Sequence, residues 1–212
     1  MLPKILTEIP GPKSRQLGEE LQKYESRNIT FISEKFPIFW DSADGINVWD
    51  VDGNRFLDLT SAFAVSSLGH RNQFITDALI RQAGKLLHGM GDVHPTELKV
   101  ELCKKISELT YERWIGVKSK SVLSSSGSES IECALKTALL ATGKEGVICF
   151  KDSYHGTSIG ALATSGISRF REPFTKQIAQ FGITAPYGIK GLSEVHNIIS
   201  SNNIGAIIVE PI

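Results

Sequence analysis

Residues 121–150, SVLSSSGSESIECALKTALLATGKEGVICF, hold a strand, a helix and a second strand in succession. The pattern predicts a short strand over Ser121–Ser124, an amphipathic helix over Glu129–Ala141 and an apolar strand over Gly146–Phe150. Strands without polar alternation that take turns with helices are typical of a parallel sheet with helices on its faces. The sequence therefore predicts an α/β fold.

The flanking segments extend this pattern in both directions. Downstream, a helix over 192–200 is expected to lead into a strand over 204–209. Upstream, Asp52-Gly53-Asn54 is a strong hairpin turn, because Gly and Asn tolerate positive φ. The remaining expected elements are a polar helix over 14–27, strands over 36–40, 46–49 and 56–59, and helices that start near Asn72 and Thr96.

Composition excludes several classes of protein. The chain has 212 residues with 23 Lys plus Arg and 23 Asp plus Glu, so its net charge is zero. This balance argues against electrostatic capture of nucleic acid or of an anionic membrane. The three cysteines form no CxxC pair, and no signal peptide or membrane-length apolar run is present, so a reduced, cytoplasmic protein is expected. His88 and His94 lack the spacing of a zinc helix, and no metal site is expected.

The segment SSSGSE, residues 124–129, is the first candidate site. It joins a predicted strand to a predicted helix, where small residues allow close approach and the free amides of the first turn can donate to an anion. The residues also fit a plain helix cap, with Ser126 or Ser128 as the capping residue. Neither GxxxxGK[ST] nor GxGxxG is present, so a phosphate would be held without those loops.

Two further candidates follow the next predicted strands. Tyr154-His155-Gly156 comes after the strand that ends near Phe150, and Glu210 comes after the strand over 204–209. An aromatic ring at such a position can stack on a planar ligand, although each residue also fits an ordinary loop or strand end. Parallel strands bring their carboxyl ends to one edge of the sheet. Together the three signals suit a planar aromatic cofactor with a phosphate tail.

The ordered motifs resemble the class III aminotransferases, pyridoxal-phosphate enzymes of fold type I. The resemblance covers nearly the whole chain and implies that the cofactor is pyridoxal 5'-phosphate. It also implies an N-terminal small-domain segment with a β-hairpin over 1–70 and a partial large domain over 71–212. The motifs that carry it are Ser125-Ser126-Gly127-Ser128-Glu129, Asp50-Val51-Asp52-Gly53, Leu68-Gly69-His70, Tyr154-His155-Gly156, Gly160-Ala161-Leu162, Pro173-Phe174 and Val209-Glu210-Pro211.

The resemblance also implies roles for individual residues. Gly127 and Ser128, with Ser126, would bind the cofactor phosphate, and Tyr154 would stack on the pyridine ring beside His155. Glu132 would lie behind the cofactor in a hydrogen-bonding role. In the substrate pocket, Glu210 would pair with an arginine or contact the substrate, and Phe63 would face the substrate.

Some features depart from the family pattern. Ile131 and Thr157 stand where the family often has Asn and Arg. The ring-nitrogen aspartate and the Schiff-base lysine of the family lie beyond Val-Glu-Pro, and no catalytic residue is expected within these 212 residues. Because the sequence stops at Ile212, directly after an apolar strand, we expect a fragment that is inactive alone.

The expected parent is a homodimeric transaminase that moves an amino group from an ω-amino acid or similar donor to a 2-oxo acid. An aminomutase, an epimerase or a decarboxylase on the same scaffold stays open. So does a non-catalytic truncated homologue.

Overall fold

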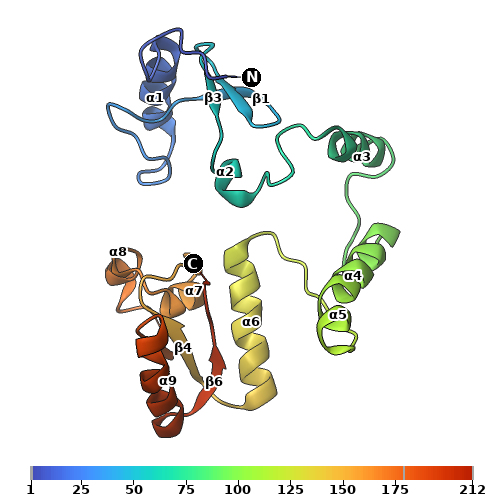
Figure 1. Cartoon of the computed structure of the whole chain (residues 1–212), viewed down its shortest axis with the longest axis vertical. Helices are drawn as coiled ribbons and strands as arrows, with labels where there is room; N and C mark the ends of the chain where they lie inside the picture. The colour runs from blue at the N-terminus through green and yellow to red at the C-terminus, as the bar shows by residue number, and fades with distance from the viewer. Residues whose placement is uncertain (1, 179, 212) are drawn as a thin grey trace. The chain divides into compact units, whose positions relative to one another are not determined.

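The computed structural model describes residues 2–178 and 180–211 (Figure 1). By their internal contacts these residues form two compact units, Met1–Thr96 and Glu97–Ile212, which are described separately. The domain boundary expected after residue 70 stays a prediction. No helix in the described part of the chain combines the length and the apolar character that a bilayer crossing needs.

The first unit contains a three-stranded antiparallel sheet in the order β1-β2-β3. The predicted hairpin is confirmed, and its turn lies between β2 and β3 with Gly53 at φ 84°. The first strand begins at Trp40, whereas the sequence predicted a strand over 36–40. The elements of this unit are α1 (Pro12–Tyr24), β1 (Trp40–Asp44), β2 (Asn47–Asp50), β3 (Arg55–Leu57), α2 (Ser61–Ala64) and α3 (Gln73–Ala83).

A buried polar network holds the hairpin turn. Asn54 is fully buried, and its Oδ1 accepts hydrogen bonds from the amides of Leu6 and Thr7, at 2.7 and 3.0 Å. Its Nδ2 and backbone N donate to the two carboxylate oxygens of Asp50, each at 2.8 Å. Because buried polar atoms are costly unless paired, this network fixes both the turn and the N-terminal segment against it.

The same turn caps α1. Asp52 accepts hydrogen bonds from the backbone N–H groups of Lys13 and Ser14, at 2.7 and 3.0 Å, and from the Ser14 hydroxyl at 2.7 Å. Burial raises the pKa of the Asp52 carboxyl, but these bonds outweigh it, and the pKa lies below its usual value. The N-cap residue of α1, Gly11, has no side chain that could accept from the amides of the first turn, so Asp52 of the hairpin accepts from them.

The segment α2 is a left-handed turn rather than an ordinary helix. Ser61, Ala62, Phe63 and Ala64 all have positive φ, between 50° and 64°, a conformation that costs L-residues about 1 kcal/mol each. Asp58 holds the turn by accepting from the Thr60 and Ala62 amides, at 3.0 and 2.8 Å. His70 Nε2 lies 2.8 Å from the same carboxylate.

The second unit contains a three-stranded parallel sheet in the order β5-β4-β6. The α/β fold class is therefore confirmed. The elements of this unit are α4 (Glu97–Leu109), α5 (Tyr111–Ile115), α6 (Gly127–Thr142), β4 (Gly146–Phe150), α7 (Ile159–Thr164), α8 (Ser168–Arg171), the 3₁₀ turn η1 (Glu172–Phe174), β5 (Gly182–Ala185), α9 (Ile189–Ser201) and β6 (Ile204–Ile207).

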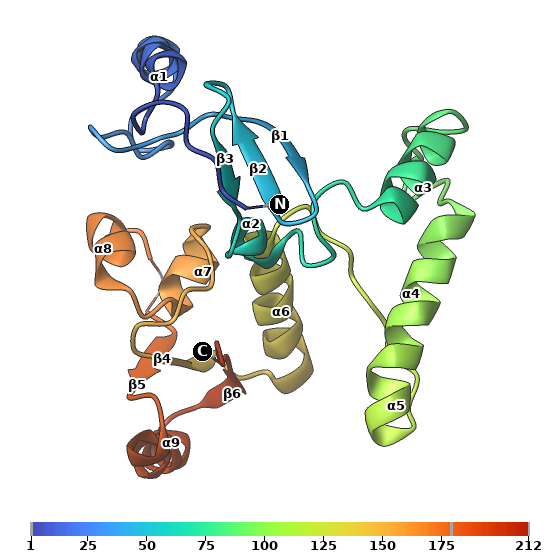
Figure 2. The same cartoon turned by 45° about the horizontal axis from the view of Figure 1, so that its top comes forward.

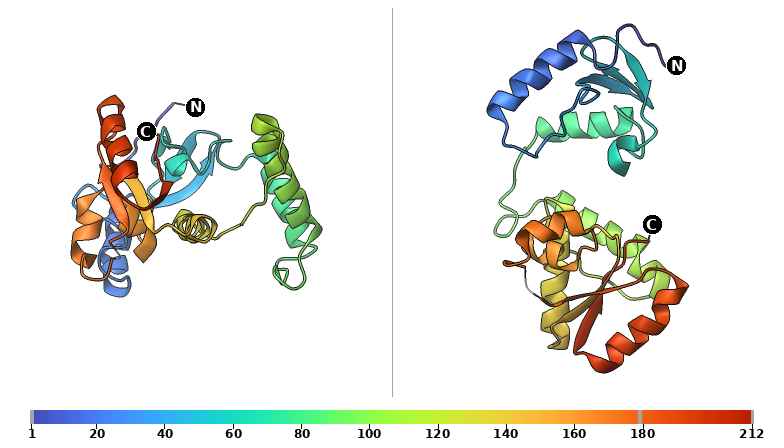
Figure 3. Two further views of the ribbon diagram at one scale, coloured as in Figure 1. Left: turned by 90° about the horizontal axis from the view of Figure 1, so that it is seen from below. Right: turned by 90° about the vertical axis from the view of Figure 1, so that its left-hand side faces the viewer.

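Helices cover both faces of the central strand. Figures 2 and 3 show α6 and α9 on opposite sides of the three strands. Val147, Ile148 and Cys149 of β4 are buried, as expected for a strand without polar alternation. Next to the sheet, Leu162 and Ala163 of α7 pack with Ile178, Phe170 and Phe181. This core holds α7, the helix that follows the loop with Tyr154 and His155.

The strand predicted over Ser121–Ser124 is absent, and the prediction was wrong. These residues are irregular, and the described sheet has no further strand beside them that could supply a hydrogen-bond ladder. By contrast, β5 was missed, because Gly182-Ile183-Thr184-Ala185 is too short to show a pattern. It becomes a strand because β4 offers it a parallel partner in register, Val147 to Gly182 through Phe150 to Ala185.

Candidate active site

The candidate site lies in the second unit, at the carboxyl edge of its sheet. β4 ends at Phe150, and Tyr154 and His155 follow it; β6 ends at Ile207, and Glu210 follows that strand. The two strands are parallel neighbours, so both ends reach the same edge. The Tyr154 amide donates to Glu210 Oε2 at 2.7 Å, which joins the two strand ends directly.

The first turn of α6 is capped by a side chain and also leaves backbone amides unpaired. Ser126 is the N-cap, and its Oγ accepts from the Glu129 amide at 3.1 Å. The Glu129 carboxylate accepts in turn from the Ser125 amide at 2.7 Å. Among the described residues, the backbone N–H groups of Gly127 and Ser128 have no acceptor. The Ser126 hydroxyl is thus used by the helix, while two amides at its positive end stay available for an anion.

The loop after β4 is attached to α6 through Ser158. Its backbone N–H donates to Ser128 Oγ at 3.0 Å, and its Oγ accepts from the same Ser128 hydroxyl at 2.8 Å. The Ser158 hydroxyl donates onward to Glu132 Oε1 at 2.7 Å. Two side chains of α6 and one from the end of the loop therefore form one continuous hydrogen-bonded chain.

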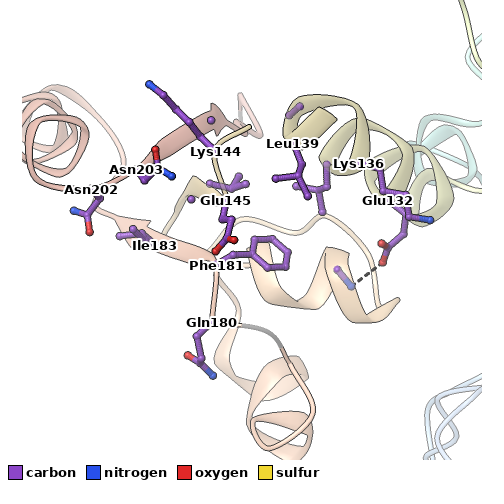
Figure 4. A pocket seen from close by; sticks show the side chains of 16 residues that line it. Glu132, Lys136, Leu139, Lys144, Glu145, Gln180, Phe181, Ile183, Asn202 and Asn203 are labelled. Atoms are coloured by element: carbon purple, nitrogen blue, oxygen red, sulfur yellow. Dashed lines mark hydrogen bonds between the residues drawn. The ribbon is translucent and has the colours of Figure 1, made fainter. Parts of the chain in front are cut away.

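Glu132 also caps α7. The Gly160 amide donates to Glu132 Oε1 at 2.7 Å and the Ala161 amide at 3.3 Å; Figure 4 draws the first of these bonds as a dashed line. Burial raises the pKa of the Glu132 carboxyl, but the bonds from Ser158, Gly160 and Ala161 lower it more, so the pKa lies below its usual value. Glu132 is therefore a carboxylate at neutral pH.

Two glycines allow the loop to approach α6 so closely. Gly156 has φ 121°, and a Cβ there would lie 2.5 Å from Ser128 Oγ. A Cβ on Gly160 would lie 2.4 Å from Glu132 Oε2. Real Cβ atoms do not approach other atoms at such distances. A side chain at position 156 would therefore push the loop away from the backbone of α6, and one at position 160 would displace the Glu132 carboxylate.

The rings at this edge have different surroundings. Tyr154 is half-exposed, and its ring packs against Phe170 of α8 with 5.5 Å between centroids. The Arg169 guanidinium lies 4.7 Å from the centre of the Phe170 ring. One part of the Tyr154 ring is thus supported by the protein, while the rest can contact a ligand.

His155 is buried, and its Nε2 has no hydrogen-bond partner among the described residues. Its backbone N–H donates to Ser165 Oγ at 3.1 Å. Burial lowers the pKa of His155, and the charge of Glu210 opposes that shift only in part. The imidazole is therefore neutral at pH 7, with one ring nitrogen left without a partner.

The structure brings together most of the residues predicted for the site. Phe63 lies in the first unit, at the tip of the left-handed turn, and is 94% exposed. Ser158 and Phe170 were missed by the sequence analysis. Ser158 stands at the N-cap of α7, a detectable signal, but its partner Glu132 lies 26 positions away on another helix. The residues that the structure gathers in the second unit are Ser126, Gly127, Ser128, Glu132, Tyr154, His155 and Glu210.

A cavity of about 660 Å³ lies elsewhere in this unit, beside α6 and near the amino ends of β4 and β6 (Figure 4). Its lining includes Leu139, Lys144 and Phe181. It touches the site residues only through Glu132 and Gly160. Glu132 therefore lies between this cavity and the other site residues, which are at the carboxyl edge of the sheet and at the start of α6.

The donor set suits a phosphate carried by a flat ring. Two unpaired amides at the start of a 16-residue helix fit an anion, because the helix dipole favours negative charge there. A half-exposed tyrosine and an unpartnered imidazole nitrogen nearby in the chain fit an aromatic group with polar substituents. These residues fit pyridoxal 5'-phosphate on both counts.

Comparison with known proteins agrees with this assignment. The family profile described as aminotransferase class-III matches residues 31–212. A [LysW]-aminoadipate semialdehyde/glutamate semialdehyde transaminase from Sulfurisphaera tokodaii is 31% identical over 91% of this chain and 45% of its own length. A 4-aminobutyrate aminotransferase from Mycobacterium tuberculosis is 30% identical over 99% of this chain and 50% of its own. The chain thus spans about half the length of the curated relatives it matches.

Solved structures show the same fold. The taurine:2-oxoglutarate aminotransferase of Bifidobacterium kashiwanohense, solved in complex with PLP and glutamate, matches with a TM-score of 0.79 and 23% identity over 96% of this chain and 48% of its own. The ornithine aminotransferase of Toxoplasma gondii ME49 matches with a TM-score of 0.78 and 22% identity over 94% of this chain and 46% of its own. On the evidence of its site, its fold and the profile match, the chain belongs to the class-III aminotransferase family.

Proposed function

We propose that the protein is a pyridoxal-phosphate-dependent transaminase that moves an amino group from an ω-amino acid or similar donor to a 2-oxo acid. One observation carries the proposal. The unpaired amides of Gly127 and Ser128 lie in the first turn of α6, and hydrogen bonds connect this turn to the loop that holds Tyr154. The names of the relatives support the reaction class, since they include transaminases for aminobutyrate, acetylornithine and semialdehyde substrates.

The roles of the chain's own residues follow from their contacts. The amides of Gly127 and Ser128 would hold the phosphate, and Ser126 fixes their direction by capping the helix. Tyr154 would pack on the ring, supported by Phe170. When bound, the cofactor supplies the electron sink that amino-group transfer requires. His155 Nε2 and the carboxylate of Glu132 would provide polar surroundings, since burial lowers the pKa of His155 and hydrogen bonds lower the pKa of Glu132.

The substrate-binding roles of Glu210 and Phe63 are part of the proposal. Glu210 already accepts from the Tyr154 amide, and its second carboxylate oxygen would be available to an arginine or to the substrate. Phe63 is exposed on the turn that Asp58 holds by a hydrogen bond, which supports a role in contacting the substrate. We also propose a homodimer that works in the cytoplasm, and the three free cysteines support a reducing compartment.

The test uses the natural protein and three measurements. The first is the absorbance change on titration with pyridoxal 5'-phosphate. The second is amino transfer from a panel of ω-amino donors to 2-oxoglutarate, against a blank without cofactor. The third is carbon dioxide release, which separates transamination from a decarboxylating reaction. Saturable cofactor binding and dependence on a 2-oxo acid are expected; a protein that shows neither is not a transaminase.

A further inference from the structure

Ser158 occupies a junction that the functional roles above leave unexplained. It makes three hydrogen bonds with two residues of α6: its amide and hydroxyl both bond Ser128, and its hydroxyl also bonds Glu132. The junction is half-buried.

The direction of these bonds can be followed from the donors. Ser128 has one hydroxyl proton, which it gives to Ser158 Oγ. Ser158 gives its own proton to Glu132, which has none to give as a carboxylate. The chain of donors therefore ends on a fixed charge, an arrangement that strengthens each bond in it.

Ser128 and Ser158 belong to different parts of the candidate site. Ser128 belongs to the first turn of α6, whose amides face the proposed anion. Ser158 ends the loop that holds Tyr154 and His155, four and three residues earlier. Since Gly156 lies against Ser128 between these points, the loop has little freedom to move while the junction holds.

We propose that Ser158 is a positioning residue that sets the Tyr154 loop against the anion-binding turn of α6, with Glu132 as its fixed acceptor. The proposal rests on the proposed cofactor site. Loss of the Ser158 hydroxyl leaves Glu132 with its two amide donors and Ser128 with the bond from the Ser158 amide, but it removes the two hydroxyl bonds that connect Ser128 to Glu132. One of the three bonds of the junction is then left, so the separation of the ring contact and the phosphate contact is held less firmly.

The experiment compares Ser158→Ala and Ser158→Thr in the natural protein, freed of cofactor and titrated with pyridoxal 5'-phosphate. Ser200→Ala is the matched control, because that hydroxyl bonds only the carbonyl of His196 in its own exposed helix. We expect Ser158→Ala to weaken the affinity by roughly three- to tenfold. The near-ultraviolet circular dichroism of the bound cofactor should fall as well. Ser158→Thr, which keeps the hydroxyl, should restore both readouts.

The outcomes separate this proposal from the one it rests on. If the unmodified protein does not bind the cofactor, the proposed function fails and this inference fails with it. If the unmodified protein binds but Ser158→Ala binds equally well with an unchanged dichroism signal, only the positioning role is overturned. If Ser158→Ala does not fold, Glu132→Gln replaces it. This variant keeps an acceptor without the charge, and it too should weaken affinity, while unchanged affinity would overturn the role.

Discussion

The backbone amide of Tyr154 and the carboxylate of Glu210, 56 positions apart, are joined by a 2.7 Å hydrogen bond across the ends of two parallel strands. The positions of Tyr154 and Glu210 therefore depend on each other as well as on the strands that precede them. The carboxylate fixes the start of the Tyr154 loop, and the Ser158 junction fixes its end.

Replacement of Glu210 tests the first of these attachments. Glu210→Ala leaves the Tyr154 amide without its acceptor, and we expect cofactor affinity to fall by about three- to tenfold, equivalent to about 0.5–1.5 kcal/mol. Glu210→Gln keeps a carbonyl acceptor and should retain most of the affinity. Fluorescence titration with pyridoxal 5'-phosphate measures both, with Glu194→Gln on exposed α9 as control. Equal losses for Ala and Gln would show that the charge matters and the acceptor does not.

Gly156→Ala should destabilise the protein. The backbone has φ 121°, and the new Cβ would lie 2.5 Å from Ser128 Oγ, so the expected loss is about 1–3 kcal/mol in the free energy of unfolding. Gly84→Ala is the control, since that residue has φ −70° and its Cβ would meet nothing closer than 3.6 Å. Urea denaturation measures both variants. Similar midpoints for the two would contradict the close contact.

Asp58 makes stability depend on pH in the acid range. The hydrogen bond with His70, aided by Thr60 and Ala62, lowers the pKa of Asp58 from 3.8 to about 2. Because the folded pKa is the lower one, the unfolded chain takes up the proton first as pH falls. The stabilisation is complete above the unfolded pKa and is lost between about pH 4 and pH 2.

Thermal unfolding of the protein and of Asp58→Asn, followed from pH 5 to pH 2, measures this effect. The gap between the two melting temperatures should be widest near pH 5 and should narrow as pH falls. A gap that stays constant over this range would mean that the carboxylate contributes no pH dependence.

Leu162→Ala should leave a cavity in the core beneath the Tyr154 loop. Leu162 is 2% exposed and packs with Ile178, Phe170 and Phe181, so the expected cost is about 2–5 kcal/mol. Leu140, 87% exposed on α6, is the control, and Leu140→Ala should change stability by less than about 0.5 kcal/mol. Denaturant midpoints separate the two, and a small effect at Leu162 would place the core elsewhere.

Periodicity and turn chemistry predicted the elements whose structure depends on residues close together in the sequence. The helix over 127–142 and the strand over 146–150 follow from apolar spacing within a single segment, and so does the placement of the serine cluster before the helix. The cap interpretation of that cluster is confirmed at Ser126, and the phosphate interpretation stays a prediction that the two unpaired amides after it leave open.

Long-range partners determine what the sequence did not reveal. β5 needs β4 beside it, and Ser121–Ser124 lacks such a neighbour in the described sheet. Glu132 was expected behind the cofactor, and its contacts with Ser158 and Gly160 come from positions 26 and 28 residues away. The left-handed turn at 61–64 contains no glycine, the residue from which positive φ is usually predicted.

The capping of α1 by Asp52 bears on the order of folding. A helix whose first turn lacks its own cap nucleates poorly, and α1 has its acceptor 38 and 39 residues downstream. The hairpin must therefore close before the helix gains its full stability. In a mutational study of the folding transition state, side chains of the β2–β3 turn should show higher φ-values than those of α1, although α1 leaves the ribosome first.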